Sequence, residues 1–312
     1  MDFVCSEEEI RGWLASKLES FAIYVPSDYG FKRARSREDI VLNFSLPTMP
    51  IKSIFFPHTD IMMKFERKFG RTIVVESLPE EERKIVLTKA CDAYSIRILD
   101  AVFLSEPVDP YYERRRKNTI FVTITCTKPC YAGFCEKLGV QPEGDVIITP
   151  LDNYYHVEVR NKELLPDFES FRRADEKDRE RAMKNRIAPN PALNIDWLKD
   201  AFEDEIWEEF SRFCISCGIC TYLCPTCHCF DITDDGSVRI RTWDSCQFPY
   251  FTMHTSGHNP RPERKHRLRN RIYHKFSYFQ QRYGFIACVG CGRCVRFCPS
   301  QIDIRELVLR RE

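Results

Sequence analysis

The chain has 312 residues, of which 43% are hydrophobic, so it can form about two domains with real cores. Its formal net charge is +1, which gives no overall electrostatic reason to expect binding to nucleic acid or to a membrane. The acidic N-terminus lacks the apolar segment of a signal peptide, and no apolar run reaches the roughly 20 residues of a membrane helix. The 16 cysteines therefore suggest metal binding in a reducing cytoplasm rather than disulfides.

The first part of the chain has the pattern of an α/β domain. Ser6 and Glu9 form a capping box at the start of an amphipathic helix that extends to Phe21. Prolines interrupt the following apolar runs, which predicts short strands and loops over residues 40–75. We place this domain, with a small mixed sheet, at residues 1–165. Its clearest elements are a parallel βαβ unit (84–89, 92–104 and 119–125) and a hairpin (145–149 and 154–159).

A charged, proline-containing stretch at 166–196 has the composition of a linker. The remainder, 197–312, is expected to be a mostly helical, ferredoxin-like domain, so the overall class is α+β. Its predicted elements are a helix over 198–210 that leads into Cys214, a hairpin (230–233 and 238–242), a basic helix over 261–281 and a short helix from Ile302.

Two copies of one cysteine pattern dominate this second domain. Each reads C-x2-C-x2-C-x3-C-P, a spacing typical of proteins that bind two [4Fe–4S] clusters, in which the fourth cysteine of each run ligates the other cluster. The spacing therefore predicts crossed ligation, in which each run supplies three ligands to one cluster and one ligand to the other. The first cluster would be held by Cys214, Cys217, Cys220 and Cys298, and the second by Cys288, Cys291, Cys294 and Cys224.

The spacing has a physical reason. A cubane offers irons at its corners, so the chain must turn tightly to present three thiolates, while the proline-ended longer gap directs the fourth thiolate away. Structural zinc is the main alternative, because paired CxxC motifs also form tetrahedral zinc sites. Two complete runs, each followed by proline, favour iron–sulfur clusters.

A third cluster is suggested by four cysteines of the first domain. Cys91 and Cys126 follow the two strands of the βαβ unit, so both should lie at the carboxyl edge of one sheet, where ligands commonly bind. Cys130 and Cys135 lie in the loop just beyond. Convergence of these four thiols on a [4Fe–4S] cluster and separate burial as small apolar residues are both consistent with the spacing.

Other side chains have less specific patterns. Cys227, Cys229 and Cys246 are expected to pack or to shape the sulfur environment, and Cys5 has no assigned role. Histidines gather in the second domain, but their spacings match no common metal site. The basic segment from Arg261 to Arg282 could contact nucleic acid, but its apolar stripe favours a core helix whose cations would raise a cluster's potential.

The chain contains neither a G-x-G-x-x-G nor a P-loop motif, and we find no place for a flavin or nicotinamide. We therefore expect no catalytic residue and no substrate site on this chain. It would carry electrons without doing two-electron substrate chemistry.

Further motifs follow one another along the chain. They are Lys89-Ala-Cys-Asp92, Cys224-Pro-Thr-Cys-His-Cys-Phe230, Arg241-Thr-Trp-Asp-Ser-Cys246, Gly257-His-Asn-Pro-Arg261, His274-Lys-Phe276 and the second cysteine run. Together they resemble the motifs of the β subunit of soluble [NiFe] sulfhydrogenases and of the A subunit of anaerobic sulfite reductase. The resemblance covers the chain from about residue 40 onward. Where members of this family often have Cys-Phe-Cys, this chain has Gly133-Phe134-Cys135.

The resemblance implies an electron-transfer subunit of a cytoplasmic oxidoreductase complex. One partner would be a flavoprotein that reacts with NAD(P)H and contains a [2Fe–2S] cluster. The other would be catalytic, either a [NiFe] hydrogenase or a sirohaem sulfite reductase. The four N-terminal cysteines match the family pattern, which favours the third cluster. Alternatives are an iron–sulfur subunit of heterodisulfide reductase type and, in a different class, a cluster-based redox sensor.

Overall fold

The predicted βαβ unit lies at the centre of the larger of two sheets. In the computed structural model, which describes residues 1–309, strand β6 (Lys84–Lys89) leads directly into helix α3 (Ala90–Phe103). Strand β7 (Thr119–Ile124) pairs with β6 in parallel, which confirms the prediction. Because both strands run the same way, the segments that begin at Cys91 and Cys126 leave the sheet at one edge.

This sheet has eight strands, so it is larger than the small mixed sheet expected. Its centre is the parallel set β2-β6-β7-β8, and antiparallel strands complete both sides. The predicted hairpin β8–β9 is confirmed. The strand order is β10-β1-β9-β8-β7-β6-β2-β3. The remaining bounds are β1 (Asp2–Cys5), β2 (Ala22–Pro26), β3 (Phe31–Arg33), β8 (Val146–Pro150), β9 (Tyr155–Val159) and β10 (Arg172–Arg173).

Both faces of the sheet are buried, as the near-continuous apolar sequence of β6 requires. Ile85 and Leu87 pack on one face in a cluster that includes Ile10 of helix α1 (Glu7–Ser16), whose predicted capping box is present. Val86 points to the other face, where it packs in a cluster with Ile96 of α3. Helices α2 (Lys52–Phe55) and α4 (Pro110–Arg116) also contribute to this second cluster, through Phe55 and Tyr112.

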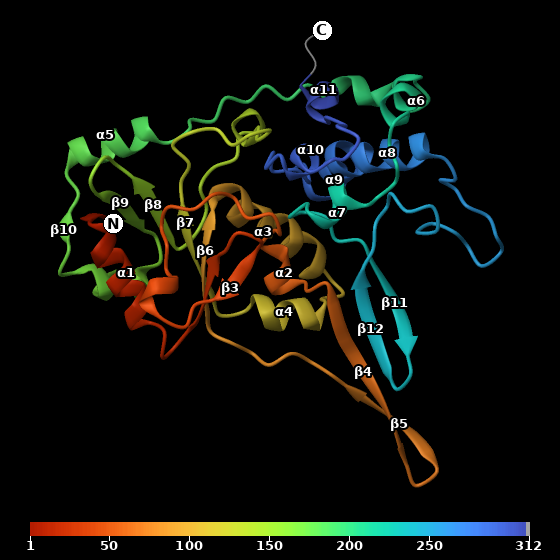
Figure 1. Cartoon of the computed structure of the whole chain (residues 1–312), viewed down its shortest axis with the longest axis horizontal. Helices are drawn as coiled ribbons and strands as arrows, with labels where there is room; N and C mark the ends of the chain where they lie inside the picture. The colour runs from red at the N-terminus through yellow and green to blue at the C-terminus, as the bar shows by residue number, and fades with distance from the viewer. Residues whose placement is uncertain (310–312) are drawn as a thin grey trace.

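A second, four-stranded sheet combines strands from distant parts of the chain (Figure 1). The hairpin β4 (Thr59–Lys68) and β5 (Arg71–Glu76) projects from the first half of the sequence, and β4 pairs with β12 (Val238–Trp243) of the predicted hairpin β11–β12. Strand β11 spans Phe230–Asp235. Arg241 of β12 donates a hydrogen bond to Asp60 of β4 at 3.1 Å and pairs with Asp109 before α4. The sheet therefore ties together residues on both sides of the expected linker.

The expected linker carries regular structure. Strand β10 pairs with β1, and helix α5 (Glu176–Asn185) begins with a capping box between Asp175 and Asp178. The 3-10 helix η3 (Lys162–Phe168) precedes them, and Phe168 packs into the core of the large sheet. The charged composition of this segment therefore does not indicate an irregular linker, because its polar residues form helix caps and surface ion pairs around a few buried side chains.

The predicted helix over 198–210 is wrong as one unit. The structure has a 3-10 helix, η4 (Asp196–Lys199), and a separate helix, α6 (Ile206–Ser211). Asp204 lies at the break, where its carboxylate accepts a hydrogen bond at 2.8 Å from the backbone N–H of Ile206, the first residue of the new helix. The Trp207 indole also donates to the carbonyl of Ala201 at 2.6 Å, which holds the intervening turn.

The basic segment forms one continuous helical rod, as predicted. It consists of α8 (Arg264–Tyr273), a π-helical turn η5 (His274–Tyr278) and α9 (Phe279–Tyr283). Leu268, Ile272 and Phe276 of its apolar stripe are buried. None of the helices in residues 1–309 is both long and apolar enough to cross a membrane. The short elements are η1 (Arg37–Asp39), η2 (Cys135–Leu138), α7 (Ile219–Tyr222), α10 (Arg293–Arg296) and α11 (Arg305–Val308).

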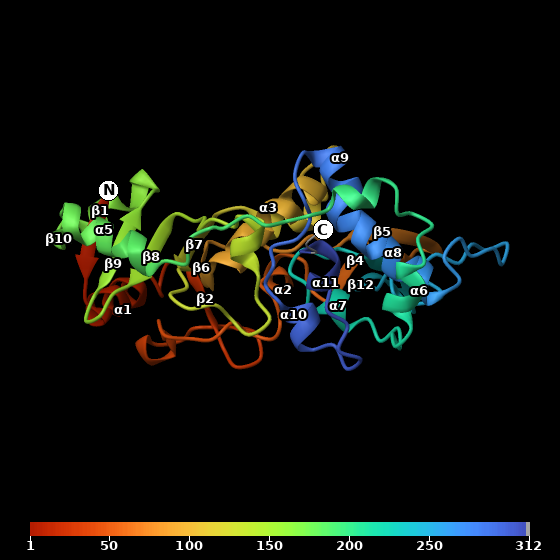
Figure 2. The ribbon, with the colours of Figure 1, turned by 90° about the horizontal axis from the view of Figure 1, so that it is seen from above.

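The molecule is elongated, with the large sheet at one end and the cysteine-rich helices at the other (Figure 2). Helix α3 extends from the sheet toward α8 and α9, so it bridges the two ends. The segments that follow β6 and β7 consequently point toward the helical end, which brings the N-terminal cysteines to the region of the two cysteine runs.

A buried histidine in β9 predicts acid sensitivity of the large sheet. His156 is 4% exposed, and neither ring nitrogen has a hydrogen-bond partner within residues 1–309. Burial lowers its pKa, so below about pH 6.5 the unfolded chain binds a proton that the folded chain resists. Stability should therefore fall as the pH drops below that value. We expect the melting temperature of His156→Phe to fall less between pH 7 and pH 5 than that of the parent protein. The exposed-site control His254→Phe should show the same fall as the parent protein. An equal fall in His156→Phe and the parent protein would contradict this account.

Candidate metal centres

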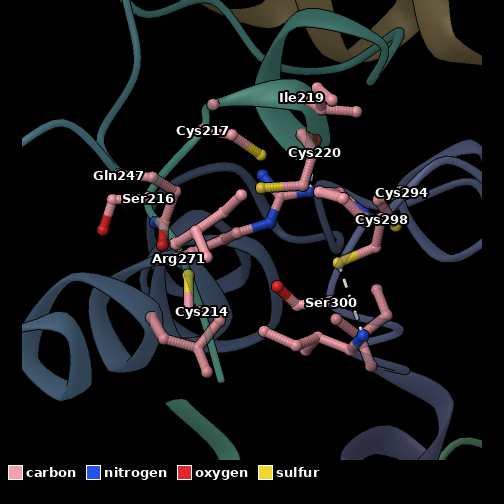
Figure 3. Close-up of a pocket in the computed structure, with 16 residues that line it drawn as sticks. Cys214, Ser216, Cys217, Ile219, Cys220, Gln247, Arg271, Cys294, Cys298 and Ser300 are labelled. Atoms are coloured by element: carbon pink, nitrogen blue, oxygen red, sulfur yellow. Dashed lines mark hydrogen bonds between the residues drawn. The ribbon is translucent and has the colours of Figure 1, made fainter. Parts of the chain in front are cut away.

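The first predicted cysteine set lines one cavity. Cys214, Cys217 and Cys220 surround it from the loop before α7 and the start of that helix, and Cys298 enters from the end of the second run (Figure 3). Their sulfur atoms point toward the shared space. Cys298 therefore lies with the three cysteines of the first run. Cys294 of the second run also lines this cavity.

The second set is the most deeply buried. Cys224 and Cys288 are each 8% exposed. Burial, together with the charge of nearby Cys224, raises the pKa of the Cys288 thiol to about 11 and that of Cys291 to about 12. Burial, together with the charges of Cys224 and Cys288, likewise raises the pKa of Cys294 to about 11. The fourth cysteine of the first run therefore lies among the three of the second run.

The third set also shares a single cavity. Its wall contains Cys91 from the start of α3, Cys126 just after β7, and Cys130 and Cys135 from the following loop. The parallel βαβ topology places Cys91 and Cys126 at the same edge of the sheet. Cys291 of the second run lines the same cavity. The three cysteine sets are therefore contiguous, with the second between the other two.

Two glycines of the second run let the first domain approach closely. Gly290 and Gly292 have φ angles of +61° and +77°, a region that other residues rarely adopt. A Cβ atom on Gly292 would lie 2.4 Å from the carbonyl oxygen of Ala132, and one on Gly290 would lie 2.7 Å from the backbone nitrogen of Cys135. The backbone N–H of Phe134 donates to the Gly290 carbonyl at 2.7 Å. The second and third sets thus touch through backbone.

The thiols suit a cofactor larger than one ion. In the part of the chain that the structure describes, no three His, Cys, Asp or Glu side chains lie close enough to bind a single metal ion. The cysteines instead stand around cavities, a layout that fits a cluster with several irons better than zinc. Because burial raises the pKa values of Cys288, Cys291 and Cys294 and so favours their protonated form, metal binding there must release protons.

Buried cations face the sulfur atoms. Lys275 donates to Sγ of Cys224 at 3.3 Å, and Arg271 donates to Sγ of Cys227 at 3.2 Å and to the Cys220 carbonyl at 2.7 Å. Lys52 donates to the Cys227 carbonyl at 3.0 Å and lies 4.0 Å from the Trp243 ring centroid. Within residues 1–309 none of these three cations forms a salt bridge to a carboxylate. Anionic iron–sulfur clusters would supply the missing negative charge.

A buried ion pair connects the second and third sets. The Arg293 guanidinium donates to both carboxylate oxygens of Asp92, at 2.6 and 2.8 Å, and to the Pro47 carbonyl at 2.9 Å. Asp92 is fully buried and Arg293 is 2% exposed. Asp92 follows Cys91 directly, and Arg293 precedes Cys294. The pair therefore fixes α3 against α10 at the point where the two cysteine sets meet.

Comparisons with known proteins agree with this chemistry. The profile of the 4Fe-4S dicluster domain family matches residues 213–302. The chain is 34% identical over 299 residues to the sulfhydrogenase 2 subunit beta of Pyrococcus furiosus, and the match covers 89% of this chain and 87% of that protein. The chain belongs to the sulfhydrogenase β-subunit family. It is an iron–sulfur electron-transfer subunit of the [4Fe–4S] type. No solved structure matches this chain.

Several residues of this β-subunit site have little or no signal in the sequence. Arg271 and Lys275 lie one helical turn apart within a segment that looks only generally basic, so their spacing is the available signal. Lys52 and the Arg293–Asp92 pair give no local signal, because their partners lie far away in the sequence. Among the histidines, His228 packs edge-on against His274 with ring centroids 5.4 Å apart, and His254 and His258 are exposed.

Removing Arg293 should destabilise the junction strongly. Arg293→Met would leave the Asp92 carboxylate buried without its partner, which typically costs about 3–5 kcal/mol. Anaerobic thermal unfolding should show a large fall in melting temperature. The double variant Asp92→Asn with Arg293→Met should recover part of it, because the uncompensated charge is gone. A single variant as stable as the parent protein would show that the ion pair does not hold the junction.

Removing Lys275 should make the neighbouring cluster harder to reduce. Lys275→Met deletes a buried positive charge next to Cys224 and should lower the potential on the order of 100 mV. Lys275→Arg keeps the charge and should retain most of the potential. Redox titration followed by electron paramagnetic resonance measures the shift, with exposed Arg282→Met as the control. Equal potentials in Lys275→Met and the parent protein would contradict the electrostatic role.

Proposed function

We propose that this chain relays single electrons through three [4Fe–4S] clusters held by the three cysteine sets. Cluster 1 would be bound by Cys214, Cys217, Cys220 and Cys298, cluster 2 by Cys288, Cys291, Cys294 and Cys224, and cluster 3 by Cys91, Cys126, Cys130 and Cys135. Each cluster takes up and releases one electron when bound. The chain's own part is to hold the thiols, exclude water and supply the surrounding charge.

One observation supports the relay most directly. Cys294 lines the cavity of the first set, and Cys291 lines the cavity of the third. Both belong to the second set, so cluster 2 would touch the walls of both neighbours. Electron transfer falls steeply with distance, and shared walls keep both steps short. The order would be cluster 1, cluster 2, cluster 3.

The two outer sets reach the surface. Cys217 of the first set and Cys130 of the third are exposed, whereas Cys224 and Cys288 of the second are buried. Phe213 and Ile215, 69% and 64% exposed, flank Cys214 of the first set in the chain, and Tyr131, 81% exposed, follows Cys130. Exposed apolar side chains next to a redox centre suit a partner interface. The chain would therefore contact different partners at its two ends.

Membership of the family supports a proposal about the partners. The relative is named as the beta component of a sulfhydrogenase. We propose that one end of this chain meets an NAD(P)H-linked flavoprotein with a [2Fe–2S] cluster, and that the other meets the catalytic component of a [NiFe] hydrogenase. The alternative catalytic partner is a sulfite reductase. The assembly would work in the cytoplasm.

Loss of Cys91 should interrupt the relay without removing its ends. We expect about 12 irons per chain in anaerobically purified protein and about 8 in Cys91→Ser. In the purified complex, electron transfer between hydrogen and NAD(P)H should fall at least about tenfold. Dye reduction by hydrogen and dye reduction by NAD(P)H, measured separately, should persist. Each assay tests only the part of the complex on one side of the missing cluster 3.

Cys5→Ser is the matched control, since Cys5 is a buried cysteine that lines none of the described cavities. It should keep both the iron content and the cross-reaction. Unchanged iron in Cys91→Ser would remove cluster 3 from the proposal. An intact cross-reaction despite lost iron would place cluster 3 outside the electron path.

A further inference from the structure

Three cysteines outside the three sets lie near the first and second of them. Cys227, Cys229 and Cys246 are all close to the buried cations Lys52, Arg271 and Lys275. The sequence favours simple packing for all three. Two of them, Cys229 and Cys246, lie close together, and polar contacts surround Cys246.

The strand pairing of the β11–β12 hairpin brings the two segments together. Phe230 is the register partner of Trp243, and one step further the backbone N–H of Asp244 donates to the Cys229 carbonyl at 3.0 Å. Cys246 therefore lies two residues beyond the position opposite Cys229. This register places the two cysteines side by side, close enough for the Cys229 thiol to donate a hydrogen bond to Cys246.

The turn that carries Cys246 is fixed by polar contacts. The Thr221 hydroxyl donates to the Ser245 hydroxyl at 2.8 Å, and the backbone N–H of Gln247 donates to the same Ser245 oxygen at 3.1 Å. The Gln247 amide donates to Sγ of Cys246 at 3.4 Å and to the Arg267 carbonyl at 3.0 Å. Such a turn holds its thiol in one place, as a disulfide partner requires.

The pair also adjoins the first cysteine set. Gln247, the neighbour of Cys246, lines the cavity of that set and appears beside Ser216 in Figure 3. Cys246 is 8% exposed, and it is close enough to Cys220 for its charge to add to the burial that raises the Cys220 pKa. An electron that reaches cluster 1 would therefore have a short path to the Cys246 sulfur.

The two thiols are electrostatically unequal. The hydrogen bond from Cys229, with Arg271 nearby, lowers the pKa of Cys246 to about 6, and the same contact raises the pKa of Cys229. An unequal pair with one thiolate is typical of thiols that exchange with disulfides.

We propose that Cys229 and Cys246 are a redox-active dithiol that forms and breaks a disulfide bond in exchange with the neighbouring clusters. This inference rests on the proposed function, because clusters are its electron source and sink. In reduction, the S–S bond breaks, two reduced [4Fe–4S] clusters give up one electron each, and one proton brings the pair to a thiol at Cys229 and a thiolate at Cys246. In oxidation, the S–S bond forms, two oxidised clusters accept one electron each, and that proton leaves. The pair would give the relay a two-electron reserve.

Thiol mapping on the intact complex tests the pair directly. The complex is purified anaerobically, poised once with an oxidising dye whose potential lies above that of protein dithiols, such as thionine, and once with dithionite, then denatured in excess iodoacetamide and digested. Mass spectrometry should find the Cys229 and Cys246 peptides joined in the oxidised sample and separately alkylated in the reduced one. Alkylation of both cysteines in both samples would overturn the proposal.

Variants provide an independent measurement. Cys246→Ser and Cys229→Ser should each keep the parent iron content and take up two fewer electrons per chain in a reductive titration. Cys5→Ser should match the parent protein in both respects. Iron loss of about four per chain in either variant would show that the thiol ligates a cluster, and an unchanged electron count would show that the pair only packs. Failure of the proposed function itself would appear separately, as low iron in the parent protein.

Discussion

The bidentate ion pair between Arg293 and Asp92 is the contact on which the arrangement of the cysteine sets depends. It lies at the junction of α3 and α10, fully removed from water, and a buried carboxylate there is tolerable only with its guanidinium in place. Because each partner is adjacent in sequence to a cysteine, the pair sets how far the second set stands from the third. The glycines Gly290 and Gly292 then permit the backbone contact that the pair enforces. A single electrostatic contact thus aligns a sheet-based site with a helix-based one.

Charge compensation explains why the helical end is built from cations and sulfur. Lys275 and Arg271 occupy the interior, where an unpaired charge would be costly, and their donors point at sulfur or at carbonyls. The π-helical turn contributes to this placement. It contains Lys275, and the carbonyl of Lys275 accepts a hydrogen bond from Ala287 at 2.7 Å. The fold of this region and its cofactors are therefore expected to stabilise each other, as in other metal-dependent domains.

Local patterns were sufficient to predict much of this structure. The βαβ unit, both hairpins, the first capping box and the long basic helix follow from periodicity and turn residues near one another in the chain. The grouping of Cys91 and Cys126 at one edge follows from the parallel topology. The pairing of β4 with β12 could not be predicted, because nothing in residues 59–68 indicates a partner at 238–243. The contacts of Lys52 and the Asp92–Arg293 ion pair could not be predicted for the same reason, because the residues involved are distant in sequence and meet only in the folded chain.

The hairpin β4–β5 has a consequence for how the protein is made. One edge of β4 pairs with β5 and the other pairs with β12. The second edge stays unpaired until the ribosome has synthesised roughly 170 further residues and completed β12. At about 5–20 residues per second, that edge stays open for roughly ten to thirty-five seconds during synthesis. An open edge strand with exposed Ile73 and Val74 on its neighbour invites pairing with other chains. The cell must therefore protect this hairpin, or deliver the rest of the chain promptly, before the sheet can close and the cysteine runs can assume their final positions.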